Sequence, residues 1–495
     1  MVMKPLEILL KSINPTVLLN VGASARITDI TDDSRRVRPG TMFVAVKGPA
    51  ADGHKYIPQA IGAGASAIVC EQIPADPDPS VIWAQVDNSA VALAALADTW
   101  YGHPSRQLTL VGVTGTNGKT TIATLLYEMA RLSGKRAGLL STVENRVNDK
   151  VYPTANTTPG VLETNRLLAE MVADGCQFCA MEVSSHGLVQ HRVDSLKFAG
   201  GIFTNLTRDH LDYHGTFDAY LKAKKSFFDM LPRDAFALVN IDDSRGRVMV
   251  QNTAARVATY STRAEADFTG RLVENRIDGS LIAFNGIDVE TRFVGRFNAA
   301  NLLAVFGAEC LLGVAPEAVA LLVSRLVPVR GRFDTRSSAD GVTAIVDYAH
   351  TPDALANVLS TINEVTGTRD RVITVFGAGG NRDHGKRPLM AAEASRYSRL
   401  VYITSDNPRD EEPRSIIDEV ATGIADDCPA VMVIDRADAI DRAIADARPG
   451  DVVLVAGKGH EDYQEFENHR RVHFDDISHV EQALARRATN PIKEL

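Results

Sequence analysis

Long apolar segments are missing from this sequence of 495 residues. No uninterrupted apolar run approaches the roughly 18–20 residues that a membrane-spanning helix needs. The N-terminal stretch MVMKPLEILLKS carries Glu7 and Lys11 among its apolar residues and lacks a small-residue cleavage site. We therefore expect neither membrane insertion nor a secretory signal.

An excess of positive charge is missing as well. The sequence has 53 Lys and Arg residues against 62 Asp and Glu, which gives a formal net charge of −9. An acidic chain is a poor match for a dedicated nucleic-acid or anionic-membrane binder. We therefore expect no nucleic-acid partner.

Cysteines are few, and their pattern does not suggest a disulfide framework. Five scattered cysteines are typical of an intracellular protein, and we expect a cytoplasmic location. Cys176 and Cys179 form a C-x-x-C within GCQFCAMEVSS, which is typical of a buried strand, and no second pair completes a zinc site. Core packing of both thiols is the prediction, with redox or metal chemistry as the alternative.

Length and apolar patterning predict three α/β domains. At roughly 100–200 residues per domain, this chain corresponds to about three. In the first part, MFVAV and SAIVC are typical of strands and residues 90–100 of a helix, and YGHPSRQ is typical of a linker. We place the N-terminal α/β domain at 1–105, the central domain at 106–332 and the C-terminal domain at 333–495.

Strands alternate with helical segments in the two larger domains. This alternation predicts a parallel sheet of the P-loop ATPase type in the central domain and a Rossmann-like doubly wound sheet in the C-terminal domain. The predicted strands are 108–113, 178–183, 200–206 and 236–241, extra β structure within 268–295, and then 343–348, 371–377, 399–405, 431–435 and 451–457.

A glycine-rich loop follows the first central strand. LTLVGV leads into TGTNGKTT (residues 114–121) and then into a helical pattern, which is the context of a phosphate-binding loop. Lys119 can reach the β- and γ-phosphates, and Thr120 can bind Mg²⁺. The usual G-x-x-x-x-G-K-[ST] pattern is incomplete because Val113 replaces the first glycine. Phosphoryl chemistry on ATP is the leading prediction, and a chance turn is the alternative.

Several segments resemble the Mur ligases, which are ATP-dependent, amide-bond-forming enzymes of peptidoglycan synthesis. Besides TGTNGKTT they are DDSR, ANTTP, MEVSSHGLVQHR, NLTRDHLDYHG, GRFNAANLLA, VDYAHTPDAL and GKGHEDYQ, in family order across nearly the whole chain. SDNPRDEEP (405–413) resembles the members that add meso-2,6-diaminopimelate. The resemblance implies transfer of this amino acid to the D-glutamate of a UDP-N-acetylmuramoyl-dipeptide, with ADP and phosphate released. We expect a monomer.

The implied chemistry requires cations and a site closed to water. A carboxylate is phosphorylated, and an amine then attacks the acyl-phosphate while divalent cations screen the charges. Thr120, Glu182 and His210 are suitable Mg²⁺ ligands, and Glu182 ends a predicted strand, at the usual functional edge of such a sheet. A strand-end glutamate and a structural histidine are the alternatives. The resemblance implies that Lys119, Glu182, His210 and Lys224 are catalytic.

Lys224 lies on the apolar face of a predicted helix, FDAYLKAKKSFFDML. Tyr220 and Phe228 share this face at helical spacing, whereas Lys222 and Lys225 point elsewhere. Lys224 could extend its amine to solvent, or its site could drive the amine neutral and leave it open to modification. The resemblance implies a carbamylated lysine, which would convert a cation into an Mg²⁺ ligand.

Two nucleotide sites are implied by the resemblance. For Asn298, which is implied for ATP, the alternative is that it caps the helix that follows GRF. Asp32, which is implied for the uridine nucleotide, would bind through its backbone. No GxGxxG is present for the uridine nucleotide. The residues implied for ATP are Gly115, Thr116, Asn117, Gly118, Lys119, Thr120, Thr121, Asn298, Asn301, Arg332 and Asp347. Those implied for the UDP-muramoyl-dipeptide are Asp32, Ser34, Gly48, Pro49, Ala50, Asn156, Thr157, Thr158, Ser184, Gln190 and Arg192.

The amino-acid site is expected in the C-terminal domain. Asp406, Asn407 and Arg409 follow a predicted strand and therefore lie at its functional edge. Diaminopimelate has one carboxylate more than lysine, and an arginine fork matches that difference. The full set implied by the resemblance is Arg387, Asp406, Asn407, Pro408, Arg409, Gly457 and Glu461. The alternative for DNPR (residues 406–409) is a turn in which proline fixes φ, and such a turn is compatible with amino-acid binding.

Three alternatives remain open at this point. One is a lysine-adding Mur ligase, which Arg409 disfavours. Another is a folylpolyglutamate-type ligase with the same ATP core, which DDSR and DNPR disfavour. The third is a nucleotide-gated binding module without ligase activity, which would be expected to lack the four catalytic residues.

Overall fold

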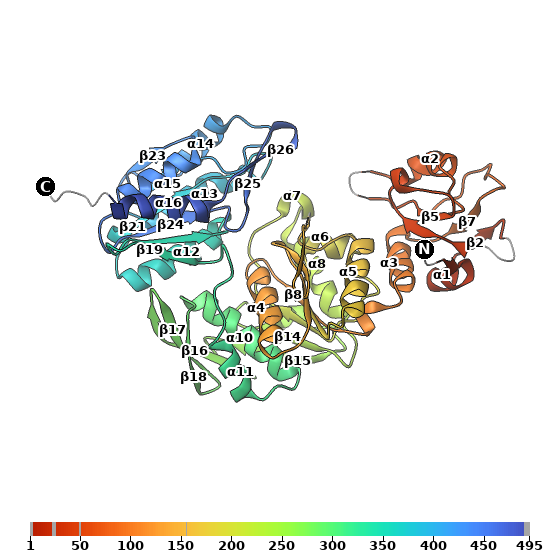
Figure 1. The fold of residues 1–495 in the computed structure, drawn as a ribbon, viewed down its shortest axis with the longest axis horizontal. Coiled ribbons are helices and arrows are strands. Elements are labelled where there is room, and N and C mark those ends of the chain that lie inside the picture. The colour runs from red at the N-terminus through yellow and green to blue at the C-terminus, as the bar shows by residue number, and fades with distance from the viewer. Residues whose placement is uncertain (1–2, 22–25, 49–50, 155, 490–495) are drawn as a thin grey trace.

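The computed structural model describes residues 3–21, 26–48, 51–154 and 156–489, and it forms three lobes in chain order (Figure 1). The central lobe lies between the N-terminal and C-terminal lobes, and each lobe has its own sheet. Among these described residues, no helix is long and apolar enough to cross a membrane.

The N-terminal sheet has five strands in the order β2-β7-β6-β5-β4. β2 is antiparallel to β7, and the other strands pair in parallel. The alternating side chains of β5 and β6 are buried on both faces, against α1 and α3 on one side and α2 on the other. The elements are β1 Lys4–Pro5, α1 Leu6–Ile13, β2 Val17–Leu19, β3 Arg26–Ile27, β4 Asp29–Thr31, η1 Ser34–Arg36, β5 Thr41–Val44, η2 Gly53–Tyr56, α2 Ile57–Gly62, β6 Ala67–Cys70, β7 Ile82–Gln85, α3 Ser89–Trp100 and η3 Pro104–Arg106.

The central sheet has eleven strands in the order β11-β10-β9-β12-β8-β13-β14-β15-β16-β17-β18. Its middle strands, from β9 to β16, are parallel, as apolar strands separated by helices require. Its strands are β8 Thr109–Thr114, β9 Ala137–Leu140, β10 Asn145–Val147, β11 Lys150–Tyr152, β12 Phe178–Glu182, β13 Gly200–Phe203, β14 Phe236–Asn240, β15 Arg256–Ser261, β16 Phe268–Arg276, β17 Gly279–Phe284 and β18 Ile287–Thr291.

Helices cover both faces of the central sheet. α4, α10 and α11 pack in one apolar core, and α5, α6, α8 and α9 pack in the other. These helices are α4 Lys119–Leu132, α5 Val161–Ala173, α6 Ser185–Val189, α7 Leu211–His214, α8 Phe217–Asp229, α9 Gly246–Met249, α10 Arg296–Leu311 and α11 Pro316–Val323.

The C-terminal sheet has the order β19-β20-β24-β21-β22-β23, with only the edge strand β19 antiparallel. α12, α13 and α14 cover one face, and α15 and α16 cover the other. The elements are β19 Asp334–Ser337, β20 Thr343–Asp347, α12 Pro352–Thr366, η4 Arg369–Arg371, β21 Val372–Phe376, α13 Lys386–Tyr397, β22 Leu400–Ile403, α14 Pro413–Ala421, β23 Ala430–Met432, α15 Arg436–Ala445, β24 Val452–Ala456, β25 Tyr463–Phe466, η5 Glu467–His469, β26 Arg470–His473 and α16 Asp476–Thr489.

The predicted fold class is confirmed, including the extra β structure, which forms β16, β17 and β18. Cys176 and Cys179 are buried and free, as core packing requires. Asn298 does not cap a helix, so that alternative is wrong. α10 has Gly295 as its N-cap, and the Asn298 side chain donates instead to the carbonyl of Val294 at 3.0 Å.

Candidate functional site

The glycine-rich loop connects β8 to α4 and is held in place by the end of β13. The Thr204 hydroxyl donates to the Asn117 carbonyl at 2.6 Å, and the Asn117 N–H donates to Asn205 Oδ1 at 2.9 Å. Gly115 has φ +149°, and a Cβ there would lie 1.8 Å from Thr204 Oγ1. Only glycine fits this close approach, so Gly115 performs the task that the usual pattern gives to the missing first glycine.

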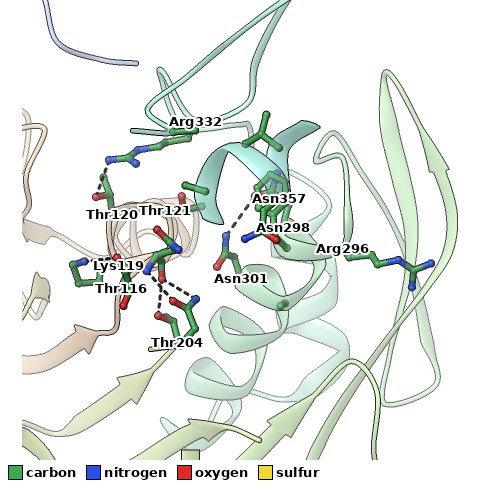
Figure 2. A pocket seen from close by; sticks show the side chains of 18 of the residues that line it. Thr116, Lys119, Thr120, Thr121, Thr204, Arg296, Asn298, Asn301, Arg332 and Asn357 are labelled. Carbon is green, nitrogen blue, oxygen red and sulfur yellow. Dashed lines mark hydrogen bonds between the residues drawn. The ribbon is translucent and has the colours of Figure 1, made fainter. Parts of the chain in front are cut away.

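The loop opens onto a cavity of about 520 Å³ between the central and C-terminal lobes. Figure 2 shows Lys119 and Thr120 on one side of it and Asn298 and Asn301 on another. The cavity brings together most of the residues implied for ATP and catalysis, namely Thr116, Asn117, Gly118, Lys119, Thr120, Thr121, Glu182, His210, Asn298, Asn301, Arg332 and Asp347.

Glu182 is fully buried at the end of β12, with one carboxylate oxygen anchored. Its Oε1 accepts from Ser141 Oγ at 2.7 Å and from the Thr142 N–H at 2.8 Å. Its Oε2 is buried with no hydrogen-bond partner among the described residues. An unpaired buried carboxylate oxygen is costly, and its place in this cavity suits a cation.

Lys224 and Lys119 converge beneath the loop on one carbonyl. Lys224 Nζ donates to Gly115 O at 2.7 Å, and Lys119 Nζ donates to the same oxygen at 3.0 Å. Burial, together with the nearby charge of Lys119, holds the pKa of Lys224 well below its usual range. Of the two readings that the sequence left open, the structure supports the buried amine over one extended to solvent. Lys224 is not among the residues that line the cavity.

His210 enters the cavity from the loop before α7, with φ +53°. Burial lowers the pKa of its imidazole to about 4 despite the neighbouring Asp209 carboxylate, 3.4 Å away. A neutral imidazole is the form that binds metals. Among the described residues, no three His, Cys, Asp or Glu side chains cluster as a complete metal site, so a cation here would need other donors as well.

Two contacts close the cavity from the C-terminal side. Arg332 Nη2 donates to Thr120 Oγ1 at 3.2 Å, and its guanidinium lies 4.4 Å from the ring centroid of Tyr348. Asn117 Nδ2 donates to Asp353 Oδ2 at 3.1 Å, from α12. The phosphate-binding loop therefore contacts both the segment joining the lobes and the C-terminal lobe itself.

Five of the residues implied for the muramoyl-dipeptide form one network beside the cavity. Thr158 Oγ1 donates to the Glu182 carbonyl at 2.9 Å and lies 3.0 Å from Ser184 Oγ. Arg192 Nη1 donates to the Thr158 carbonyl at 2.6 Å, and its Nη2 donates to Gln190 Oε1 at 2.6 Å. Thr157 lines the cavity, and its Oγ1 accepts from Thr142 Oγ1 at 3.0 Å. Because the Thr142 N–H donates to Glu182, this contact connects Thr157 to the same network.

The remaining residues implied for the nucleotide-sugar lie apart from this network. Ser34 is buried in the N-terminal lobe, where it donates to Gln59 Oε1 at 3.0 Å, and Asp32 is exposed beside it. Asn156 is exposed, and Gly48 ends the segment after β5. Pro49 and Ala50 lie outside the described residues.

The implied amino-acid residues converge from two loops, after β22 and after β24. Asn407 Nδ2 donates to Glu461 Oε2 at 2.9 Å. Gly457 has φ +116°, and a Cβ there would lie 2.6 Å from Asp406 Oδ2. The two loops are therefore packed tightly against each other.

The two arginines of this set differ in how much of the side chain is already engaged. Arg409, which follows Pro408, donates to the Gly380 carbonyl at 2.8 Å, and its Nε is 3.8 Å from Glu465 Oε2. Arg387 is buried and donates to Glu411 at 2.9 Å and to Glu419. Arg387 is therefore engaged by two carboxylates, whereas Arg409 has guanidinium donors with no hydrogen-bond partner among the described residues.

Sequence reasoning missed several residues that hold the site. Ser141 and Thr142 orient Glu182, Asp353 bonds to the phosphate-binding loop, and Lys458 lies between Asn407 and Glu461. The segments VDYAHTPDAL and GKGHEDYQ contained the last two. Nothing in sequence spacing distinguished them from their neighbours.

A parallel sheet with a phosphate-binding loop that faces a doubly wound sheet across a shared cavity defines an ATP-dependent ligase. Three family models match the chain in order: "Mur ligase family, catalytic domain" at 26–101, "Mur ligase middle domain" at 113–309 and "Mur ligase, glutamate ligase domain" at 331–459. The chain belongs to the Mur ligase family.

Two similar proteins and one similar solved structure carry the same name. A UDP-N-acetylmuramoyl-L-alanyl-D-glutamate–2,6-diaminopimelate ligase of Parabacteroides distasonis is 56% identical, over 91% of this chain and 93% of its own. The ligase of that name from Bacteroides thetaiotaomicron is 54% identical, over 94% of this chain and 97% of its own. A solved structure with the same name has a TM-score of 0.65 at 30% identity and covers 93% of this chain and 95% of its own.

Proposed function

We propose that this chain is an ATP-dependent ligase that joins meso-2,6-diaminopimelate to the D-glutamate of UDP-N-acetylmuramoyl-L-alanyl-D-glutamate in peptidoglycan synthesis. One observation carries the proposal beyond the names of relatives. Tyr348 lines the cavity of the phosphate-binding loop, and its hydroxyl donates to Glu461 Oε1 at 3.4 Å. The nucleotide cavity and the amino-acid residues are therefore neighbours.

The reaction needs two displacements in this cavity. A γ-carboxylate oxygen of the D-glutamate attacks the γ-phosphorus of ATP, and the bond from that phosphorus to ADP breaks. The uncharged amine of diaminopimelate then attacks the acyl carbon, phosphate leaves, and the amine loses a proton. Lys119 and the N-terminus of α4 stabilise phosphate charge, and Arg332 brings a further cation from the joining segment.

The donors of the cavity fit Mg²⁺. Glu182 Oε2, which has no partner among the described residues, and the Thr120 hydroxyl are oxygen donors of the kind that Mg²⁺ prefers. The imidazole of His210 would add a nitrogen donor, which Mg²⁺ uses less often. A bound Mg²⁺ would screen the triphosphate charges that otherwise repel the carboxylate. Glu182 is pre-oriented for this by Ser141 and Thr142.

Lys224 joins this set only after modification, because an amine that donates to Gly115 is not a metal ligand. Its burial and depressed pKa favour the neutral amine, which is the form that reacts with carbon dioxide. We propose that the neutral amine adds to the carbon of carbon dioxide and loses a proton, which gives a carbamate anion near the phosphates.

Arg409 favours diaminopimelate over lysine within this proposal. Its unengaged guanidinium donors suit the carboxylate that lysine lacks. A folylpolyglutamate-type ligase is disfavoured because Arg409 and the DDSR segment have no role in it. A binding module without activity is disfavoured because the four residues implied as catalytic, Lys119, Glu182, His210 and Lys224, are all present. We also propose the domain bounds 1–105, 106–332 and 333–495, a monomer, and a cytoplasmic location.

A substrate-omission assay tests the proposed function. ADP release is measured with all three substrates and then with each one left out. We expect turnover only when ATP, the UDP-muramoyl-dipeptide and diaminopimelate are all present. ADP release that is independent of the dipeptide or of the amino acid would contradict the proposal.

A further inference from the structure

We propose that Lys458 is a positioning residue of the amino-acid pocket, which it serves by fixing the orientation of Asn407 and Glu461. This proposal rests on the proposed function and deepens it. Lys458 is not one of the residues that the family resemblance implies for amino-acid binding. Lys458 follows β24 and is fully buried.

The ammonium of Lys458 connects the two loops of the pocket. Its Nζ donates to Asn407 Oδ1 at 3.1 Å and to Glu461 Oε2 at 3.1 Å. The Nζ also lies 5.4 Å from the ring centroid of Tyr463. Burying a cation is costly unless its partners are fixed, so these two contacts determine where the side chain can lie.

The first contact fixes the amide of Asn407. Its Oδ1 accepts from Lys458 and also from the Glu465 N–H at 3.0 Å. With two donors on the oxygen, the amide cannot rotate by 180° without placing its NH₂ against both of them. The Asn407 NH₂ therefore points to Glu461 Oε2, 2.9 Å away.

The second contact selects which oxygen of Glu461 remains available. Oε2 accepts from both Lys458 and Asn407. Among the residues that the structure describes, Oε1 accepts only from the Tyr348 hydroxyl, at 3.4 Å, which is longer than an ordinary O–H···O bond. Glu461 thus keeps acceptor capacity on Oε1 for an incoming ammonium group.

Two effects of Lys458 oppose each other, and this makes the proposal testable. A cation beside Glu461 weakens the attraction of that carboxylate for an ammonium group, so its removal alone would tighten binding. Loss of the fixed geometry would instead loosen binding, because Asn407 and Glu461 could then reorient. The proposal states that the geometric effect is larger.

The test compares Lys458→Met with Lys458→Gln, which keeps a shorter N–H donor. Arg442→Met is the matched control, since it removes an exposed cation of the same lobe that pairs with Asp438. For each variant we would measure kcat, the KM for the amino acid, the KM values for both nucleotides, and the melting temperature. The wild-type enzyme is assayed with diaminopimelate and with lysine. The variants are then assayed with the amino acid that the wild-type enzyme uses.

We expect Lys458→Met to raise the amino-acid KM at least tenfold while both nucleotide KM values stay within twofold. Lys458→Gln should give an intermediate amino-acid KM, and Arg442→Met should match wild type. Should Lys458→Met fail to fold, Lys458→Gln decides by the same criterion. A lowered or unchanged amino-acid KM, or an equal rise in all three KM values, would overturn the positioning role alone. A wild type that uses neither amino acid would overturn the proposed function and this role with it.

Discussion

Replacement of Arg409 should separate amino-acid recognition from the rest of the reaction. Its backbone N–H donates to the Glu465 carbonyl at 2.9 Å, and its φ is +52°. Arg409→Ala keeps both features, because alanine has the same N–H and meets the same left-handed strain. The variant therefore removes only the guanidinium, which has one bond to Gly380 and lies 3.8 Å from Glu465.

The expected magnitude follows from the lost carboxylate contact. A hydrogen bond to a charged group contributes about 1.5–3 kcal/mol, or about 10- to 150-fold in kcat/KM. Arg409→Ala should therefore lose at least this factor with diaminopimelate. Wild type should prefer diaminopimelate to lysine by roughly 10⁴ or more, because lysine leaves the remaining guanidinium donors of Arg409 without a carboxylate to accept from them.

Steady-state kinetics with both amino acids checks these values. Arg414→Ala is the control, because Arg414 is an exposed arginine nearby that pairs only with Asp418 in the contacts described here, and it should retain wild-type kinetics. Arg409→Ala need not gain activity with lysine, since the rest of the pocket is unchanged. The reasoning is refuted if wild type uses lysine equally well, or if Arg409→Ala keeps diaminopimelate kinetics within twofold.

Three further changes test other parts of the site. Lys119→Ala should abolish ligation because the γ-phosphate loses its main cation, and an activity within tenfold of wild type would reject that role. Lys224→Ala should be nearly inactive, with partial rescue by short-chain carboxylic acids, and an intact mass showing only free amine in active enzyme would count against the carbamate. Gly457→Ala should raise the amino-acid KM about tenfold or more, because its Cβ would lie 2.6 Å from Asp406 Oδ2 at φ +116°. An unchanged KM would contradict that close packing.

Much of the fold could be predicted because its signal is local. Buried parallel strands such as Val452–Ala456 are continuous apolar runs, and Phe178–Glu182 is apolar up to its final residue. Ala137–Leu140 was missed because AGLL contains no β-branched residue, and Arg256–Ser261 because polar residues interrupt it. Each strand also needs a parallel partner from elsewhere in the chain, Phe178–Glu182 for the first and Phe236–Asn240 for the second.

Site residues that are contiguous in sequence could likewise be predicted, whereas contacts between distant residues could not. The phosphate-binding loop is contiguous, so its sequence predicts its function. The apolar helix face placed Lys224 beside Tyr220 and Phe228 but left open whether its amine is buried, which the structure shows. The bond between Asn117 and Asp353 joins residues 236 positions apart, and the one between Lys458 and Asn407 joins residues 51 apart. Such contacts follow from topology, which spacing along the chain does not contain.

The central claim is that the D-glutamate carboxylate is phosphorylated and then joined to diaminopimelate. The most direct measurement uses UDP-muramoyl-dipeptide labelled with ¹⁸O in that carboxylate and records the masses of both products. We predict a conjugate equal in mass to dipeptide plus diaminopimelate minus one labelled water, and one ¹⁸O atom in the released phosphate. Unlabelled phosphate, or no conjugate of that mass, would contradict the account.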